Sequence, residues 1–350
     1  MKETKLLKSI LIPTLGLSAI GTIAAVSTSC GQANPDPDPD KKQGSYVILS
    51  ANENSKLTLN NHGVNNPDLQ YSTDNGASWS QYSSQLDKLD INQGQTLYLK
   101  GYNPDGFSHS TSIYSYLSVT GGDVSISGNV MGLLNNGAIP GEQGDITAIP
   151  CDSCFYNLFL DSTAITSVSD DFLPAMNLTE NCYRSMFNGC SSLVKAPELP
   201  ARNLANWCYA YMFDGCTSLT TTAPELPATT LAESCYRSMF DDCLSLVKAP
   251  ELPATTLAQD CYNDMFTSCS SLTTAPVLPA TSLAGGCYYY MFLKCTYLNS
   301  IKIGYTGDCD SKYFSGWVSG VSASGTFYYN GDQQTAQDFG LPSGWATEQF

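Results

Sequence analysis

The chain has 350 residues, with 32 acidic and 16 basic side chains and a formal net charge of −16. An excess of negative charge repels phosphate backbones and anionic lipid headgroups, so nucleic acid is not expected as a ligand. The sequence has two histidines, His62 and His109, and neither lies near the repeats described below. No cofactor is expected.

Residues 1–29 are predicted to be an export signal. Lysines at the start precede a short apolar run, residues 10–26, and the small residue Ser29 stands directly before Cys30. This ending resembles the bacterial lipoprotein signal, which implies that Cys30 carries a fatty-acyl group such as palmitate and becomes the first mature residue. We therefore expect a lipid anchor on the outer face of a bacterial cell membrane. An ordinary cleaved signal and an uncleaved anchor remain as alternatives.

Residues 30–44 are predicted to be an acidic, proline-rich linker. Alternating Pro and Asp at 35–40 favours an extended, self-repelling chain that would hold the folded part away from the membrane. Calcium binding by Asp36, Asp38 and Asp40 is disfavoured, because neither a glycine turn nor a terminal glutamate follows.

Residues 45–130 are predicted to form a small, sandwich-like all-β domain. Short β-rich runs such as YVILSA and TLYLKGY are separated by Asn, Asp, Gly and Pro clusters, and Asp74-Asn75-Gly76 predicts a hairpin. Ser72, Asp74, Gly76 and Trp79 also resemble the Asp-box hairpin of sialidases. With one copy in a chain of three arginines, the pattern indicates a hairpin and not a catalytic site.

Residues 131–310 contain a repeated phrase. The segments CYRSMFNGC, CYAYMFDGC, CYRSMFDDC, CYNDMFTSC and CYYYMFLKC start at intervals of 26 or 27 residues, at Cys182, Cys208, Cys235, Cys261 and Cys287. A proline phrase such as SLVKAPELPATTLA recurs between them. Repeats of this length are typical of solenoids, in which neighbouring units bury each other's apolar faces.

Each unit is predicted to contain one short helix and one short strand. At about 100° per residue, the unvarying Cys, Tyr, Met and Phe positions of residues 208–216 fall on one helical face, and Thr230 with Glu233 has capping-box spacing before the next unit. Only two to four strand residues are expected after the second cysteine, because the prolines that follow cannot donate to a ladder. The predicted fold class is therefore α/β, a solenoid behind the β domain.

Ten of the 14 cysteines lie in the repeated phrases. Two cysteines eight apart on a helix would be about 12 Å apart along its axis, beyond the reach of a disulfide. Between units, equivalent cysteines would stack with parallel side chains, which favours buried thiols over disulfides or zinc. Cys151 and Cys154 form a CxxC motif, but Cys154 aligns with the first cysteine of later units, so a redox or metal role is disfavoured.

The phrases MFxxCxSLxxAPELPATTLAxxCY, WVSGVSASGTF, LPSGW and YSTDNGASW resemble the BspA-like leucine-rich-repeat surface proteins of bacteria over most of residues 45–350. The resemblance implies a curved leucine-rich-repeat solenoid of short strands and short helices on an exported protein. For some members it also implies adhesion, or binding of host proteins. The first unit departs from the pattern at Ser162, where the second cysteine is expected. The cysteine phrase lapses from Asp308, and residues 311–350 are predicted to form a C-terminal cap.

No catalysis is expected, because the repeats lack histidine and the chain has neither GxSxG nor a phosphate loop. We expect a binding or adhesion module for a host or extracellular protein or glycan. Solenoids bind through exposed positions that vary between units, and the candidate contact residues of this kind are Lys195, Trp207, Tyr211, Lys248, Tyr289 and Tyr290. A structural or antigenic surface-coat lipoprotein without a dedicated ligand remains the main alternative; it would lack a saturable site.

Overall fold

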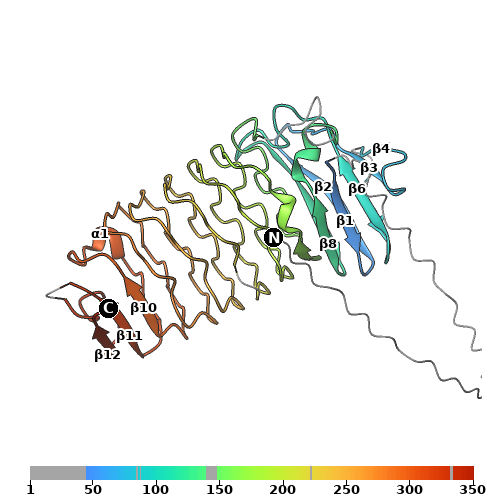
Figure 1. Ribbon diagram of the computed structural model, residues 1–350. Helices are drawn as coiled ribbons and strands as arrows, with labels where there is room; N and C mark the ends of the chain where they lie inside the picture. The colour runs from blue at the N-terminus through green and yellow to red at the C-terminus, as the bar shows by residue number, and fades with distance from the viewer. Residues whose placement is uncertain (1–44, 84–85, 87, 139–147, 221–222, 332–333) are drawn as a thin grey trace, which may run out of the picture. The chain divides into compact units, whose positions relative to one another are not determined.

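The computed structural model describes residues 45–350 except residues 84–85, 87, 139–147, 221–222 and 332–333. The predicted export signal, Cys30 and the acidic linker therefore lie outside the described residues. Strands lie at the two ends of the described part and turns form its middle (Figure 1), while helix in this part is limited to the 3-10 helices η1, Val130–Leu133, and η2, Asp170–Phe172, and to the helix α1, Ser311–Phe314. No helix of this part is long and apolar enough to cross a bilayer. The mixed, strand-rich content agrees with the predicted α/β class in outline.

Two sheets form the N-terminal part, as the β-rich runs predicted. A six-stranded sheet has the order β4-β3-β6-β1-β8-β9, and a three-stranded sheet has the order β5-β2-β7. All pairs are antiparallel except β8 with β9. The strands are β1 Val47–Ala51, β2 Ser55–His62, β3 Gln70–Ser72, β4 Ser80–Gln81, β5 Leu89–Ile91, β6 Thr96–Lys100, β7 Tyr114–Gly121, β8 Val124–Gly128 and β9 Ile165–Val168.

The two sheets share one apolar interior. Alternate residues of β1 are buried, as a half-buried strand requires, and Val47 and Leu49 are fully inaccessible to solvent. From the other sheet, Leu57 of β2 and Leu117 of β7 belong to the same buried cluster. Both sheets therefore contribute buried apolar residues to the core, as the predicted sandwich-like domain requires.

The predicted hairpin at Asp74-Asn75-Gly76 is confirmed between β3 and β4. Asn75 and Gly76 have positive φ angles of 59° and 82°. The carboxylate of Asp74 accepts hydrogen bonds from the Ser72 hydroxyl at 2.6 Å and from the Ser78 amide at 2.9 Å. These bonds lower the pKa of Asp74 to about 2. Its side chain is occupied within its own turn, which is a structural role.

The repeat segment, residues 151–321, does not form the predicted helix in each unit. In the unit that begins at Cys182, every fourth residue has a left-handed backbone: φ is 56° at Asn181, 55° at Ser185 and 73° at Gly189. The chain between them consists of consecutive turns. The helix prediction was therefore wrong for the units, and a ribbon of four-residue turns takes the place of each helix.

Backbone hydrogen bonds explain how this ribbon is stable. Alternate amides bond within the unit, as when the Met186 amide donates to the Tyr183 carbonyl at 3.2 Å. The intervening amides bond to the next unit, as when the Phe187 amide donates to the Met212 carbonyl at 3.0 Å. An α-helix would satisfy its amides internally beyond the first four, whereas this ribbon uses alternate amides to join neighbouring units.

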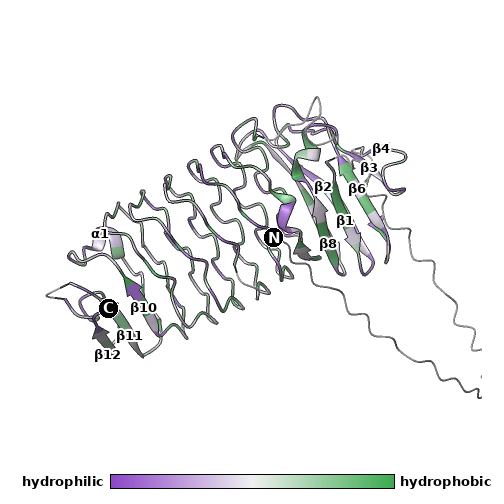
Figure 2. Cartoon of the chain, viewed as in Figure 1, coloured by the Kyte–Doolittle hydropathy of each residue, from purple (hydrophilic) through white to green (hydrophobic). Residues whose placement is uncertain are grey.

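The strict spacing of four explains why the ribbon forms. Cys182, Met186 and Cys190 are buried, and so are Tyr183 and Phe187, each four residues from its counterpart. Over eight residues an α-helix would rotate such a stripe by about 80°, whereas four-residue turns keep it on one side. Each unit of the repeat segment accordingly contains both hydrophobic and hydrophilic stretches (Figure 2). Many left-handed positions carry Gly, Asn or Asp, which accept positive φ readily.

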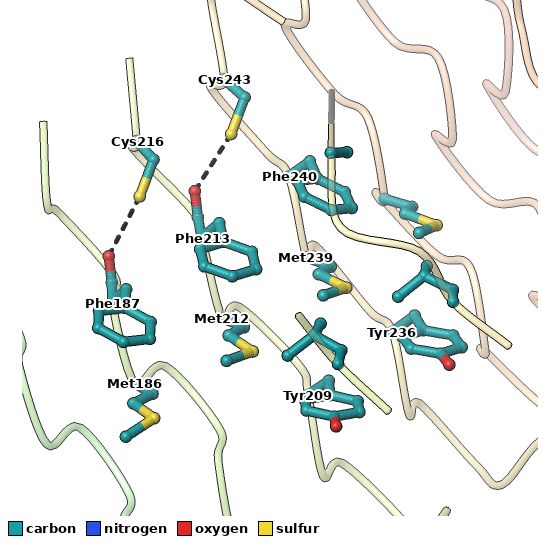
Figure 3. Packing of buried hydrophobic residues seen from close by; sticks show 14 of the residues in the cluster. Met186, Phe187, Tyr209, Met212, Phe213, Cys216, Tyr236, Met239, Phe240 and Cys243 are labelled. Carbon is teal, nitrogen blue, oxygen red and sulfur yellow. Dashed lines mark hydrogen bonds between the residues drawn. The ribbon is translucent and has the colours of Figure 1, made fainter. Parts of the chain in front are cut away.

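Identical side chains stack from unit to unit (Figure 3). The rings of Phe187 and Phe213 are 5.8 Å apart and those of Phe213 and Phe240 are 5.7 Å apart, all nearly parallel. Beside them, the Cys216 thiol donates to the Phe187 carbonyl at 3.2 Å, and the Cys243 thiol does the same with Phe213. Neighbouring units are therefore joined by backbone hydrogen bonds, by stacked aromatic rings and by hydrogen bonds from cysteine thiols to backbone carbonyls.

The thirteen described cysteines are all free, and eleven of them are buried. The ladder of buried thiols predicted between units is confirmed in this structure. Burial raises the pKa of these thiols, for example to about 12 at Cys295, so little reactive thiolate is present at neutral pH.

The first unit is hydrogen-bonded to the β domain through Ser162, the residue that departs from the repeat pattern. The Ser162 hydroxyl, in place of the expected cysteine, donates to the Leu117 carbonyl at 2.9 Å and accepts from the Val119 amide at 3.0 Å. The β9 strand then extends the six-stranded sheet. In later units the expected strand is reduced to isolated bridges such as Thr274 with Ser300, because the nearby prolines cannot donate.

The predicted cap begins with one further turn of the ribbon. The Phe292 amide donates to the Trp317 carbonyl at 2.7 Å, and the indole of Trp317 donates to the Phe339 carbonyl at 2.7 Å. A parallel sheet of β10 Ser300–Ile303, β11 Ser324–Tyr329 and β12 Gly344–Glu348 completes this part. Trp345 of β12 is buried.

Replacing Gly215 by Ala tests whether the units contain left-handed turns, because the substitution changes the free energy of unfolding in opposite directions in a turn and in a helix. Gly215 has φ of 72°, and an added Cβ would meet only ordinary contacts at 3.6 Å. We expect Gly215→Ala to lower the free energy of unfolding by about 1–2 kcal/mol, whereas in a helix it would raise it by about 1 kcal/mol. Urea denaturation measures the difference. Gly285→Ala, where nothing lies within 4 Å, is the control and should be neutral or stabilising.

Candidate binding surface

Equivalent positions of successive units form columns, because each unit is bonded to the next at the same places. Two residues after the first cysteine, one column holds Arg184, Ala210 and Arg237 in three successive units. The two arginines are half-buried, and Ala210 between them is fully buried. The small side chain at the middle position leaves space between the two arginines.

The side chain of Trp207 lies between these two arginines. The Cζ atom of Arg184 is 4.8 Å from a ring centroid of Trp207, and that of Arg237 is 5.5 Å from it. Arg184 is also 5.4 Å from the ring of Tyr211 and 5.9 Å from that of Tyr156. We call these five half-buried residues, from four successive units, the arginine–aromatic cluster.

The arginines of the cluster have unused hydrogen-bond donors. Nη1 of Arg184 donates to Oδ1 of Asn181 at 3.1 Å, but the Nε atoms of Arg184 and Arg237 are buried without a partner. Among the described residues, no carboxylate forms an ion pair with either arginine, although the charge of Arg237 opposes the burial that raises the pKa of Asp264. The exposed part of each half-buried arginine can accept an anionic group, because a guanidinium presents a planar fork of donors to a carboxylate or phosphate.

Trp207 and Tyr211 have left-handed backbones, as do the equivalent residues of the other units, including Tyr290 at the position of Tyr211. Their φ angles are 60° and 59°, which is unusual for bulky side chains. The unit before them has Asn181 and Ser185 at these two positions. Strain of this kind costs of order 1–3 kcal/mol per residue and is found mainly at ligand sites and switch regions. The two aromatic residues therefore occupy positions that folding alone would give to smaller residues.

The predicted contact residues divide into separate groups. Trp207 and Tyr211 belong to the cluster. Tyr289 and Tyr290 lie together, with ring centroids 6.2 Å apart, and the ring of Tyr290 lies so close to Gly316 that a Cβ there would be 2.5 Å from Cε1. Tyr290 therefore covers the start of the cap.

The predicted lysines lie outside the cluster. Both Lys195 and Lys248 are exposed, and Lys195 forms an ion pair with Asp170 at 3.0 Å. Lys195 also lines a groove of about 580 Å³ on the proline side of the repeat segment. This groove has both Arg202 and Glu225 in its wall and no aromatic side chain, so it lacks the Trp and Tyr residues that contribute strongly to binding energy.

Sequence reasoning missed Arg184, Arg237 and Tyr156 as parts of this surface. Aligning the phrases CYRSMF, CYAYMF and CYRSMF places both arginines in one column with alanine between them. Trp207 stands just before the middle phrase. The aligned repeats therefore contained the signal for this arrangement. We missed it because we predicted a helix in each unit, and a helix would place other residues next to each other in neighbouring units.

A second column, next to the left-handed positions, holds the carboxylates of Asp214 and Asp241. Burial raises the pKa of Asp214 to about 6, although a hydrogen bond donated by Asn188 at 3.0 Å partly offsets this rise. Burial, followed by the charges of nearby carboxylates, raises the pKa of Asp241 to about 7. Among the described residues, no three His, Cys, Asp or Glu side chains are grouped so that they could hold a metal ion.

Comparisons of this chain with family models, with curated proteins and with solved structures find no match.

The raised pKa values predict that mild acid stabilises the protein. The native state takes up protons at Asp214 and Asp241 at a higher pH than the unfolded chain, whose Asp pKa is about 3.9. The free energy of unfolding should therefore rise as the pH falls from about 8 to 5. Urea denaturation across this range checks the slope. Asp241→Asn should make it shallower, and the exposed Asp171→Asn should not; an unchanged slope in Asp241→Asn would contradict this reading.

Proposed function

We propose that this protein is a lipid-anchored cell-surface protein with a leucine-rich-repeat solenoid of the BspA-like kind. It acts as a non-catalytic binding or adhesion module for a host or extracellular protein or glycan. The observation that carries the proposal is the arginine–aromatic cluster, in which two arginines that form no ion pair among the described residues flank a strained tryptophan.

The residue types of the cluster support a binding role. Trp, Tyr and Arg dominate the energetics of protein interfaces, because their large, rigid side chains bury much area at a small entropic cost. Stacking on the rings of Trp207 and Tyr211 restricts Arg184 before a partner arrives, which reduces the entropy lost on binding. The partner should therefore present an acidic group beside a flat apolar surface.

The overall charge adds selectivity to this surface. The chain carries a formal net charge of −16, so most of its surface repels an acidic partner at long range. An anionic group that reaches the cluster is attracted locally by Arg184 and Arg237. Affinity should consequently depend on the cluster and not on general electrostatic attraction.

Binding of the labelled protein to immobilised host-cell surface and matrix extracts tests the proposal. We expect saturable binding that unlabelled protein competes away. Trp207→Asn should reduce the affinity at least about 30-fold, the effect of a 2 kcal/mol hot spot. Asn181 occupies the equivalent position one unit earlier, so this variant should fold with unchanged or greater stability.

Two further variants make the test specific. Arg184→Lys keeps the charge but loses the planar fork and its stacking, and should also weaken binding. Tyr289→Ser lies outside the cluster and should bind as the wild type does. Non-saturable binding, or equal affinity of all variants, would instead favour a structural or antigenic coat protein without a dedicated ligand.

The lipid anchor is a separate part of the proposal, supported by the sequence before Cys30. Replacing Cys30 by Ser removes the thiol that would carry the acyl group. We expect the wild type expressed in bacteria to incorporate labelled palmitate and partition into detergent, and the Cys30→Ser protein to do neither. Equal labelling of both proteins would exclude Cys30 as the acylated residue.

A further inference from the structure

The CxxC motif of the first unit lies in a position that no other unit shares. Its last residue, Cys154, occupies the place of the first cysteine of later units, while Cys151 stands three residues earlier. The equivalent residue of the next unit is Thr179, whose hydroxyl donates to the Cys151 carbonyl at 2.6 Å. Later units have alanine there, at 205, 232, 258 and 284. A cysteine pair three residues apart therefore occurs only in the first of these units.

The backbone brings these two cysteines within disulfide range. The turn of residues 151–154 is bonded to residues 179–182, with the Ser153 amide donating to the Glu180 carbonyl at 2.8 Å. In that next unit the Cys182 amide closes the turn on the Thr179 carbonyl at 3.3 Å. The Cα atoms at the ends of a β-turn are less than about 7 Å apart, and disulfides join Cα atoms about 4.4–6.8 Å apart.

The side chains also converge. A Cβ atom at Gly106 would lie 2.4 Å from Sγ of Cys151 and 3.5 Å from Cα of Cys154. The sulfur of Cys151 is therefore next to the backbone of Cys154, in a space that exists because residue 106 is glycine. The φ of Gly106 is 106°, which also favours glycine.

Cys151 differs from the stacked thiols in its accessibility. It is half-exposed, whereas Cys154 is fully buried. The neighbouring Cys154 thiol lowers the pKa of Cys151, while burial raises that of Cys154. Among the described cysteines, Cys309 is also half-exposed and provides a comparison, because burial and nearby carboxylates raise its pKa to about 11.

We propose that Cys151 and Cys154 are a reversible dithiol–disulfide site that reacts with low-molecular-weight disulfides such as oxidised glutathione. The Cys151 thiolate attacks one sulfur of the oxidant, forming a mixed disulfide and releasing one glutathione thiolate, which takes up the proton that Cys151 lost. The Cys154 sulfur then attacks Sγ of Cys151, forming the intramolecular disulfide. It displaces the second glutathione, which leaves with the proton from Cys154. The two electrons given up by the cysteine pair reduce the oxidant to two thiols.

The disulfide would act where the β domain meets the first unit. The Cys154 carbonyl accepts a hydrogen bond from the Ser108 amide at 2.9 Å, and Gly106 precedes that loop position by two residues. Oxidation would therefore restrain the first turn beside the loop that contacts it. The proposed oxidation is independent of the proposed function, because it does not depend on whether the arginine–aromatic cluster binds a partner.

The full-length protein, purified reduced, is treated with oxidised glutathione at neutral pH, and its thiols are mapped by alkylation and mass spectrometry. We expect a Cys151–Cys154 disulfide without bound glutathione. Before oxidation, iodoacetamide should modify Cys151 at least about tenfold faster than Cys309, because the thiolate is the reactive form. Equal rates, or a glutathione adduct that persists on the wild type, would overturn the proposal.

Two substitutions separate the roles of the sulfurs. Cys154→Ser should retain glutathione on Cys151, because the resolving thiol is missing. Cys151→Ser should yield neither an adduct nor a disulfide at this site. Because this variant changes a half-exposed residue, it keeps the test decisive if Cys154→Ser fails to fold. Cys309→Ser should behave as the wild type. Oxidation of Cys154 in the Cys151→Ser protein would contradict the assignment of Cys151 as the attacking thiol.

Discussion

Alternate amides of each ribbon bond to carbonyls of the next unit, and the rest of the repeat segment depends on this arrangement. It fixes neighbouring units in register, so that Phe187, Phe213 and Phe240 stack nearly parallel and each second cysteine reaches a carbonyl of the unit before it. A single unit would leave half of its ribbon amides without partners. Stability of such a segment is therefore shared between neighbours, and isolated units have little of it.

The same register creates the arginine–aromatic cluster. Arg184 and Arg237 belong to units that are not in direct contact, yet Trp207 in the unit between them reaches both. Each unit supplies one part, and the backbone bonds set their separation. The surface is therefore positioned by the regular part of the structure, while its chemistry comes from the few residues that differ between units.

The sequence predicted the β-rich N-terminal part, the hairpin at Asp74 and the buried Cys, Tyr, Met and Phe positions. It failed on the conformation of the units, because five apolar residues within nine fit one helical face almost as well as one side of a four-residue ribbon. The strict spacing of Cys182, Met186 and Cys190 was the signal that distinguishes them. Arg184 and Arg237 were missed for the same reason, since contacts between units follow from the ribbon. Tyr290 is exposed, as expected, and its ring also packs on Gly316.

Because every unit joins its neighbours through the same bonds, recombination could delete one complete unit and leave both junctions intact. Loss of the 208–216 unit, with its linking segment, would place the units of Arg184 and Arg237 directly side by side and remove Trp207. The number of repeats and the binding surface therefore respond differently to the loss of one repeat. The scaffold tolerates a change in length by whole repeats, whereas the surface depends on the order in which particular repeats follow one another.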